Sequence, residues 1–168
     1  MTQLPTYKLM IPGPAELDET VLQATAQQTA AHYGTAWTAL HRETTNLLRG
    51  VFLTTGDIFL LFCSGSGGIE AALNTLFAPD ERVLTVVNGY YGQRLCAIAQ
   101  SLGLDVVTVS APLGQSINPE TVRDKLTQDA HIRGLITVHH ETSSGVLNPL
   151  AELGAAAQAH DALFVVDS

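Results

Sequence analysis

Short apolar runs that alternate with helical segments are the feature of this sequence that most constrains its fold. The runs cover residues 58–63, 82–87, 104–109, 132–138 and 162–167. A short, wholly apolar run is typical of a strand that is buried on both faces of a sheet. Helical crossovers between such strands give a parallel sheet with helices packed on both of its faces. The sequence therefore predicts an α/β fold with a mostly parallel sheet and helices on both faces.

The segments between and before these runs predict the helices and the domain organisation. Helices are expected over 36–52, 69–77, 92–102, 119–126 and 149–160. The prolines of Pro12-Gly13-Pro14 exclude a helix there and predict an extended arm. A further helix should follow, with Glu16, Asp18 and Glu19 near its start, where carboxylates suit the helix dipole. We expect residues 1–20 to form an N-terminal arm and residues 21–168 to form one large domain.

Composition excludes several classes of function. Hydrophobic residues make up 46% of the chain and charged residues 14%, which indicates a well-buried interior. The net charge of -8 leaves no basic stripe for a nucleic acid. No apolar run approaches the roughly 20 residues that span a bilayer. Cys63 and Cys96 are too few for a disulfide framework or a zinc site. We therefore expect a cytoplasmic protein without a nucleic-acid or membrane partner.

In parallel sheets the ligand site lies beyond the carboxyl ends of the strands, so the residues after each run are the most informative. Ser64-Gly65-Ser66-Gly67-Gly68 follows the first run and opens a helix. Small residues and free N–H groups at a helix start suit a phosphate. The loop is not a Walker motif, and Glu70 stands where a dinucleotide motif needs glycine. A plain glycine-rich turn is the alternative interpretation.

Aromatic and hydroxyl side chains follow two of the later runs. Tyr91, after the second run, could stack on a flat ligand or pack under a loop. His139, His140 and Glu141, after the fourth run, suggest a metal, but adjacent residues of an extended segment point to opposite sides. We therefore expect no metal site. The hydroxyl-rich loop that starts at Thr142 is better suited to hydrogen bonds with a polar ligand.

A carboxylate closes the last run. Asp167 follows the apolar residues of 162–166, and a carboxylate there is energetically costly unless it is paired. A cationic group of a ligand would offset that cost. The alternative is that Asp167 caps a helix that follows it.

Taken in order, these motifs resemble those of the class V aminotransferases, which are pyridoxal-phosphate (PLP) enzymes of fold type I. The similarity is greatest to the alanine–glyoxylate and 2-aminoethylphosphonate–pyruvate group. The matching segments are IPGP, SGSGGIEAAL, NGYYGQR, HHETSSGVLNPL and VVDS. Each segment is a weak signal alone, but five in this order are specific.

The resemblance implies a role for each matching residue. Ser64, Gly65 and Ser66 would hold the PLP phosphate. Tyr91 would stack on the pyridine ring, and Thr142 would form a hydrogen bond near the ring hydroxyl. Asp167 would pair with the protonated pyridine nitrogen. Pro12 and Gly13 of the arm would lie at the substrate.

The resemblance also implies the activity. It predicts transfer of an amino group from an amino acid or aminophosphonate to a 2-oxo acid such as glyoxylate or pyruvate. The Schiff-base lysine of the family is expected beyond Ser168, because Lys8 and Lys125 do not follow a strand beside the motifs. We therefore expect no catalytic residue in this chain and no transamination by the chain alone.

Two alternatives to an aminotransferase remain open. One is another fold type I enzyme, such as a cysteine desulfurase or lyase, although that group typically stacks a histidine where Tyr91 stands. The other is a non-catalytic fragment or split-enzyme subunit, because the chain ends directly after a strand that nothing covers. An uncovered sheet seeks partners. We expect a homodimer or assembly with a complementary C-terminal chain.

Overall fold

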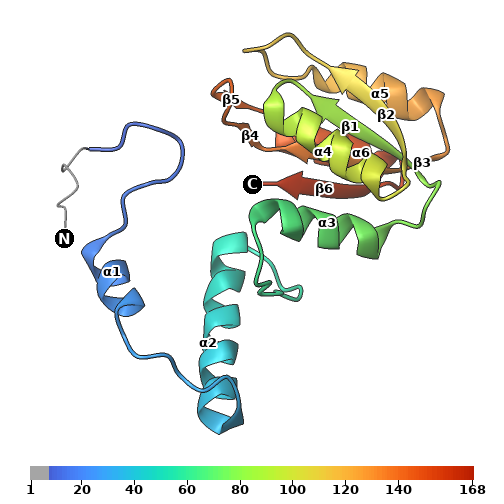
Figure 1. Cartoon of the computed structure of the whole chain (residues 1–168). Coiled ribbons are helices and arrows are strands. Elements are labelled where there is room, and N and C mark those ends of the chain that lie inside the picture. Colours follow the sequence, from blue (N-terminus) through green and yellow to red (C-terminus); the bar gives the residue numbers. More distant parts are fainter. Residues whose placement is uncertain (1–7) are drawn as a thin grey trace. The chain divides into compact units, whose positions relative to one another are not determined.

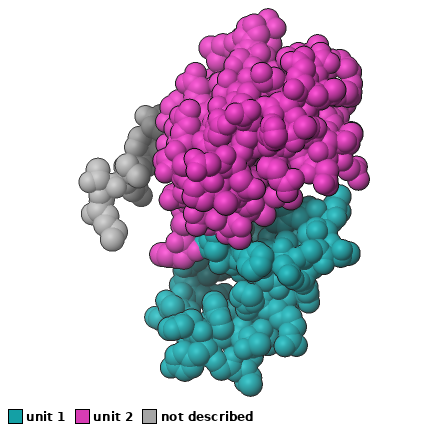
Figure 2. Space-filling model, turned by 90° about the vertical axis from the view of Figure 1, so that its right-hand side faces the viewer, with its two compact units in different colours: residues 1–61 teal, residues 62–168 magenta. Residues whose placement is uncertain are grey.

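The computed structural model describes residues 8–168, which form two compact units. The first unit ends at Leu61, and the second comprises Phe62–Ser168. Figure 2 shows the two units in different colours.

The first unit contains two helices. Helix α1 comprises Glu19–Thr25, and the Asp18 side chain caps it by accepting a hydrogen bond from the Thr20 N–H at 2.9 Å. This confirms the expected carboxylates at the start of the first helix. Helix α2 comprises Gly34–Phe52 and begins two residues before the predicted 36–52.

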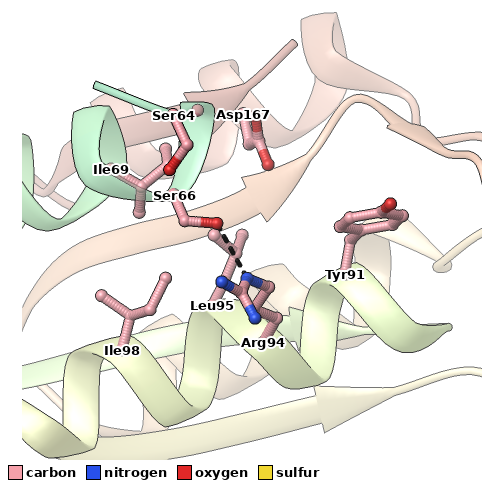
Figure 3. Close-up of a pocket in the computed structure, with 9 residues that line it drawn as sticks. Ser64, Ser66, Ile69, Tyr91, Arg94, Leu95, Ile98 and Asp167 are labelled. Atoms are coloured by element: carbon pink, nitrogen blue, oxygen red, sulfur yellow. Dashed lines mark hydrogen bonds between the residues drawn. The ribbon is translucent and has the colours of Figure 1, made fainter. Parts of the chain in front are cut away.

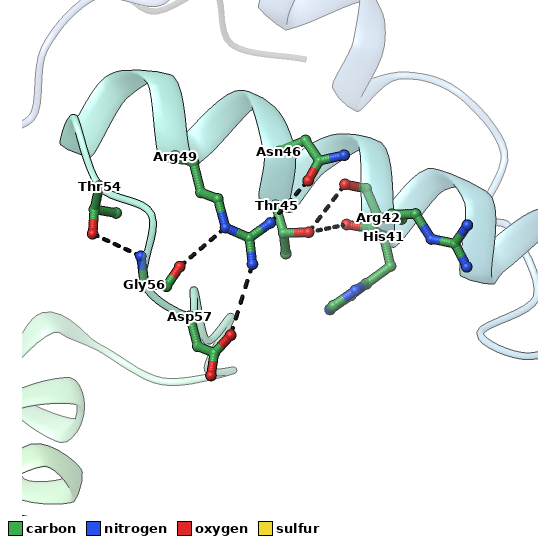
Figure 4. Close-up of polar contacts among 8 residues, drawn as sticks. All are labelled: His41, Arg42, Thr45, Asn46, Arg49, Thr54, Gly56 and Asp57. Carbon is green, nitrogen blue, oxygen red and sulfur yellow. Dashed lines mark hydrogen bonds and ion pairs between the residues drawn. The ribbon is translucent and has the colours of Figure 1, made fainter.

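The end of α2 is held by one arginine (Figure 4). The Nε of Arg49 donates to the Gly56 carbonyl at 3.0 Å, and its Nη1 donates to the Asn46 Oδ1 at 2.8 Å. An ion pair joins Arg49 to Asp57 at 3.8 Å. Leu53 ends the helix in the left-handed conformation. Since these groups are exposed, the contacts direct the loop after α2 and contribute little to stability.

The predicted strand at 58–63 is wrong. These residues form no strand, and all of them except the half-buried Ile58 are exposed, with Phe59 at 80% and Phe62 at 111% of full exposure. A strand needs a neighbour to satisfy its N–H and C=O groups, and this segment pairs with no strand of the described residues. An apolar run indicates burial only when the tertiary structure supplies a partner.

A four-stranded parallel sheet forms the centre of the second unit (Figure 1). Its strand order is β2-β1-β3-β6, and every neighbouring pair runs parallel. The strands are β1 Arg82–Val87, β2 Asp105–Ser110, β3 Ile132–Val138 and β6 Leu163–Asp167. Four of the five predicted strands are thus confirmed to within one residue at each end.

Helices cover both faces of this sheet. They are α3 Gly65–Leu76, α4 Tyr90–Ser101, α5 Pro119–Gln128 and α6 Leu150–Ala159. One apolar cluster joins α3 and α4 to the sheet, and a second joins α5 and α6 to its other face. Alternate strand residues enter the two clusters, as Val83 and Leu84 of β1 do. The predicted α/β fold is confirmed. No helix within residues 8–168 has the length and apolar character to cross a membrane.

A short hairpin lies after β3. Its strands, β4 His140–Glu141 and β5 Val146–Leu147, pair antiparallel. The sequence did not predict it, because two-residue strands carry no periodicity. The hairpin returns the chain to the start of α6 and places its loop beside the strand ends.

Two buried amides tie together the loops at the carboxyl ends of the strands. The Asn88 Nδ2 donates to the Asn148 Oδ1 at 2.9 Å, and the Asn148 Nδ2 donates to the Asn88 Oδ1 at 3.2 Å. Asn88 also donates to the Gln115 carbonyl, and Asn148 donates to the Val138 carbonyl. The Ile117 N–H donates to Asn148. Buried amides that satisfy each other in this way fix the relative positions of the loops.

We predict that Asn148→Ala lowers the free energy of unfolding by about 1–3 kcal/mol, because it leaves the buried Asn88 amide without its partner. Urea denaturation measures the loss. Asn74→Ala, on the exposed face of α3, is the matched control and should change stability by less than about 0.5 kcal/mol. Equal stability of the two variants would show that the amide pair does not hold these loops.

Candidate functional site

A pocket of about 260 Å³ lies where α3, α4 and the end of β6 meet (Figure 3). Its lining combines hydroxyls, one guanidinium, one carboxylate and an apolar floor. The lining residues are Ser64, Gly65, Ser66, Ile69, Tyr91, Arg94, Leu95, Ile98 and Asp167. We call it the serine pocket.

A second pocket of about 260 Å³ shares two residues with the first, Tyr91 and Asp167. Its lining comes from α4, from the ends of β3 and β6 and from the hairpin of β4 and β5. The lining residues are Tyr91, Val138, His140, Thr142, Asp167 and Ser168. We call it the threonine pocket.

The two pockets bring together all six residues predicted to contact the cofactor. Ser64, Gly65 and Ser66 lie in the serine pocket, and Thr142 lies in the threonine pocket. As predicted, three of the contributing segments follow the carboxyl ends of β1, β3 and β6. Pro12 and Gly13 are exposed residues of the first unit and line neither pocket.

Residues 64–68, which we call the serine loop, form the N-terminus of α3. The helix begins at Gly65, four residues before the predicted start, because Ser64 caps it. The Ser64 Oγ accepts from the Gly67 N–H at 3.4 Å, and the Ser64 carbonyl accepts from the Gly68 N–H at 3.1 Å. The first N–H groups of a helix have no intrahelical partner and form the positive end of its dipole. This end of α3 therefore favours an anion in the serine pocket.

The sequence did not predict Arg94, which also lines the serine pocket. Its Nε donates to the Ser66 Oγ at 2.8 Å, so the side chain reaches from α4 to the start of α3 (Figure 3). It is the only Lys or Arg that lines either pocket within the described part of the chain. The signal was present in NGYYGQR, because Arg94 lies one helical turn after Tyr91 and therefore on the same face of α4. A guanidinium beside a helix N-terminus strengthens the preference for an anion.

Glu141 is fully buried next to the start of α4. Its Oε2 accepts from the Gly92 N–H at 3.0 Å, and its Oε1 accepts from the Tyr91 N–H at 3.4 Å and the Ser143 N–H at 3.2 Å. The Ser143 hydroxyl also donates to Oε1. Burial raises the pKa of the Glu141 carboxyl, but these hydrogen bonds outweigh burial and hold the pKa below its usual value. Glu141 is therefore a carboxylate.

Asp167 differs from Glu141 in having no donor. Its carboxylate accepts no side-chain or N–H hydrogen bond from any residue of the range 8–168 that would stabilise the charge. Burial, and secondly the negative charge of Glu141, raise the pKa of Asp167 above its usual value. An ionised carboxylate in this position favours a cationic ligand group.

The remaining candidate residues, His139 and Lys125, line neither pocket. His139 lies within 2.9 Å of the Ser168 hydroxyl, and among residues 8–168 no three His, Cys, Asp or Glu side chains gather as metal ligands. Lys125 lies on α5, which packs on the face of the sheet away from α3 and α4. It lines neither pocket.

Comparison with known proteins agrees with this geometry. The family model "Aminotransferase class-V" matches residues 9–168. A solved ureidoglycine–glyoxylate aminotransferase of Bacillus subtilis superposes with a TM-score of 0.93 and 30% identity, over 98% of this chain and 43% of that one. A 2-aminoethylphosphonate–pyruvate transaminase of Lysinibacillus sphaericus is 30% identical over 96% of this chain and 45% of its own length. The soluble hydrogenase 42 kDa subunit of Anabaena cylindrica is 34% identical over 95% of this chain and 43% of its own length.

The fold is that of the fold type I PLP aminotransferases, and the chain belongs to the class V aminotransferase family. The chain spans less than half the length of the curated relatives named above.

The pockets fit the cofactor of this family, pyridoxal phosphate. The phosphate is an anion, and the serine pocket offers a helix N-terminus, two serine hydroxyls and the Arg94 guanidinium. The pyridinium is a flat cation, and the shared wall of the two pockets offers one aromatic ring and the Asp167 carboxylate, which has no donor among residues 8–168. These donors and acceptors have the charges that the two ends of the cofactor require.

We predict that Asp167→Asn raises the stability of the ligand-free protein at neutral pH. The raised pKa of Asp167 means that the folded state binds its proton more tightly than the unfolded state. Stability is therefore lost as pH rises from the usual aspartate pKa through the raised value, and the asparagine variant avoids this loss. Urea denaturation at pH 7 and at about pH 3, below the usual aspartate pKa, measures the difference, which should shrink at the lower pH.

Asp124→Asn, on the exposed surface of α5, is the matched control because it removes one negative charge elsewhere. It separates the effect of burial from that of the net charge of -8. A ligand-free Asp167→Asn protein that is less stable than the parent at pH 7 would contradict the prediction.

Proposed function

We propose that the complete protein is a PLP-dependent aminotransferase that moves an amino group from an amino acid or aminophosphonate to a 2-oxo acid. One observation supports this above all others. The serine pocket has groups that favour an anion, and it shares the Tyr91 ring and the Asp167 carboxylate with the threonine pocket. Among residues 8–168 this carboxylate has no donor. The family match agrees with the proposal.

Each residue has one task in this proposal. The N–H groups of Gly65 and Ser66, with the hydroxyls of Ser64 and Ser66, hold the phosphate. Tyr91 stacks on the pyridine ring, and Thr142 forms a hydrogen bond near the ring hydroxyl. The binding of the phosphate fixes one end of the cofactor, and the ring contacts fix its tilt.

Asp167 holds the proton on the pyridine nitrogen. When bound, the cofactor supplies an electron sink for the negative charge that develops at the substrate α-carbon. A fixed carboxylate keeps the ring nitrogen protonated and so strengthens that sink. The cationic ring in turn offsets the cost of the buried Asp167 charge, for which the described residues provide no donor.

The remaining features of the complete protein are also part of the proposal. The Schiff-base lysine lies outside residues 1–168, and Pro12 and Gly13 of the 1–20 arm lie at the substrate. Residues 21–168 belong to the PLP-binding large domain of a cytoplasmic homodimer or of an assembly with a complementary C-terminal chain. Glyoxylate and pyruvate are the first acceptors to test, because the relatives' names include them.

A screen of amino donors tests the function. The complete protein, with PLP, is incubated with glyoxylate or pyruvate and with alanine, serine, aspartate or 2-aminoethylphosphonate as donor. We expect conversion of the 2-oxo acid to its amino acid with at least one donor. Release of sulfide from cysteine without amino transfer would favour a desulfurase, and failure to bind PLP would overturn the proposal.

A charge substitution in the serine loop tests the proposed binding of the phosphate. We expect Ser66→Asp to weaken PLP binding by at least about tenfold, because the new carboxylate faces the phosphate and can also pair with Arg94. Equilibrium titration of PLP with the complete protein measures the dissociation constant. Ser101→Asp, at the exposed far end of α4, adds the same charge and should leave binding unchanged. Equal affinities of the two variants would remove the serine loop from the site.

Substitution of Tyr91 tests the proposed stacking on the pyridine ring. We expect Tyr91→Ala to weaken PLP binding by roughly 1 kcal/mol, or about fivefold, which is the contribution of an aromatic stacking pair. Tyr91→Phe keeps the ring and should retain affinity. Tyr90→Ala is the matched control, since Tyr90 lines neither pocket although its ring lies 5.2 Å from that of Tyr91. If Tyr91→Ala binds PLP like the parent, Tyr91 is only a packing residue.

A further inference from the structure

The start of α4 lacks a cap of its own. Its N-cap residue is Gly89, which has no side chain to accept from the first N–H groups of the helix. These groups belong to Tyr90, Tyr91 and Gly92. Because free N–H groups at a buried helix end are costly, a different part of the chain must satisfy them.

The end of β4 and the loop after it supply the missing acceptors, although they lie about 50 residues further along the chain. The Ser143 hydroxyl accepts from the Tyr90 N–H at 3.0 Å. The Glu141 carboxylate accepts from the N–H groups of Tyr91 and Gly92 and is itself held by Ser143. We call Glu141 and Ser143 the α4 cap.

Gly89 allows the α4 cap to approach this closely. A Cβ atom at this position would lie 2.4 Å from the Glu141 Cγ and Cδ atoms and 2.6 Å from the Ser143 Oγ. These distances are too short for a Cβ atom unless the Glu141 and Ser143 side chains shift. The close approach of Glu141 to the start of α4 therefore depends on glycine at position 89.

The α4 cap is linked through the backbone to Tyr91 and Thr142, the two residues proposed to contact the cofactor ring. Glu141 binds the backbone of Tyr91, whose ring lines both pockets. Thr142 stands between the two cap residues in the sequence and lines the threonine pocket. A shift of the cap must therefore move Tyr91 and Thr142 together.

From this geometry we infer that Glu141 is a positioning residue that holds Tyr91 and Thr142 in their places beside the cofactor ring. The inference rests on the proposed function, because the ring is that of PLP. Glu141 lines neither pocket and therefore acts through the backbone of Tyr91 and through its own loop. Its buried negative charge also raises the pKa of Asp167, which places the two carboxylates within electrostatic reach of each other.

A double-mutant cycle on PLP affinity tests this role in the complete protein. We expect Glu141→Gln to weaken PLP binding by about fivefold, the size of the Tyr91 contact, because it loosens the positions of both Tyr91 and Thr142. In a Tyr91→Ala background the same substitution should weaken binding by less than half as much. Equal fold-changes in both backgrounds would overturn the inference. Glu70→Gln, on the exposed surface of α3, is the matched charge control and should not change binding.

The visible circular dichroism of bound PLP provides a second measurement, because it reports the orientation of the ring. Glu141→Gln and Gly89→Ala should both change this signal, since one weakens the cap and the other displaces it. Gly50→Ala places its Cβ in open space and should leave the signal as in the parent. An unchanged signal in folded Gly89→Ala protein that binds PLP contradicts the inference. Absence of PLP binding by the parent itself contradicts instead the proposed function.

Discussion

Parallel pairing of β1, β3 and β6 brings the carboxyl ends of three strands to one edge of the sheet. In register, Val138 lies opposite Asp167, while β1 joins the other side of β3. Tyr91, Thr142 and Asp167 follow or end these strands, and they are separated by long stretches of sequence. The pocket lining therefore depends on the hydrogen-bonded ladder, because no local interaction could bring these residues together.

The polar groups at this edge fall into two kinds. Asn88 pairs with Asn148, and Glu141 accepts from the start of α4, so these buried groups satisfy one another within the protein. Asp167 has no hydrogen-bond donor among the described residues, and the start of α3, although Ser64 caps it, has a dipole that favours an anion. A protein retains such groups at a cost in stability, and in the proposed function they are the groups that the cofactor satisfies.

The sequence predicted the strands within the sheet well because their apolar runs are short and end in polar residues. The run at 58–63 has the same character but pairs with no strand of the described residues, and its residues from Phe59 onward are exposed. Hydrophobicity reports a tendency to be buried, whereas strand formation needs a neighbouring backbone. The predicted start of α3 is four residues too late, because Ser64 caps a first turn rich in glycine, a residue with low helix propensity.

By itself the sequence determined the α/β class, the order of the elements and the residues that lie at the strand ends, because local periodicity and glycine-rich loops carry that information. It also carried the motifs by which the family is recognised. Only the tertiary structure decided that Arg94 reaches Ser66, that Glu141 caps a helix about 50 residues earlier, and that Asp167 has no donor within residues 8–168. These facts depend on which side chains meet across the sheet edge, and contacts between distant segments leave no periodic signal in the chain.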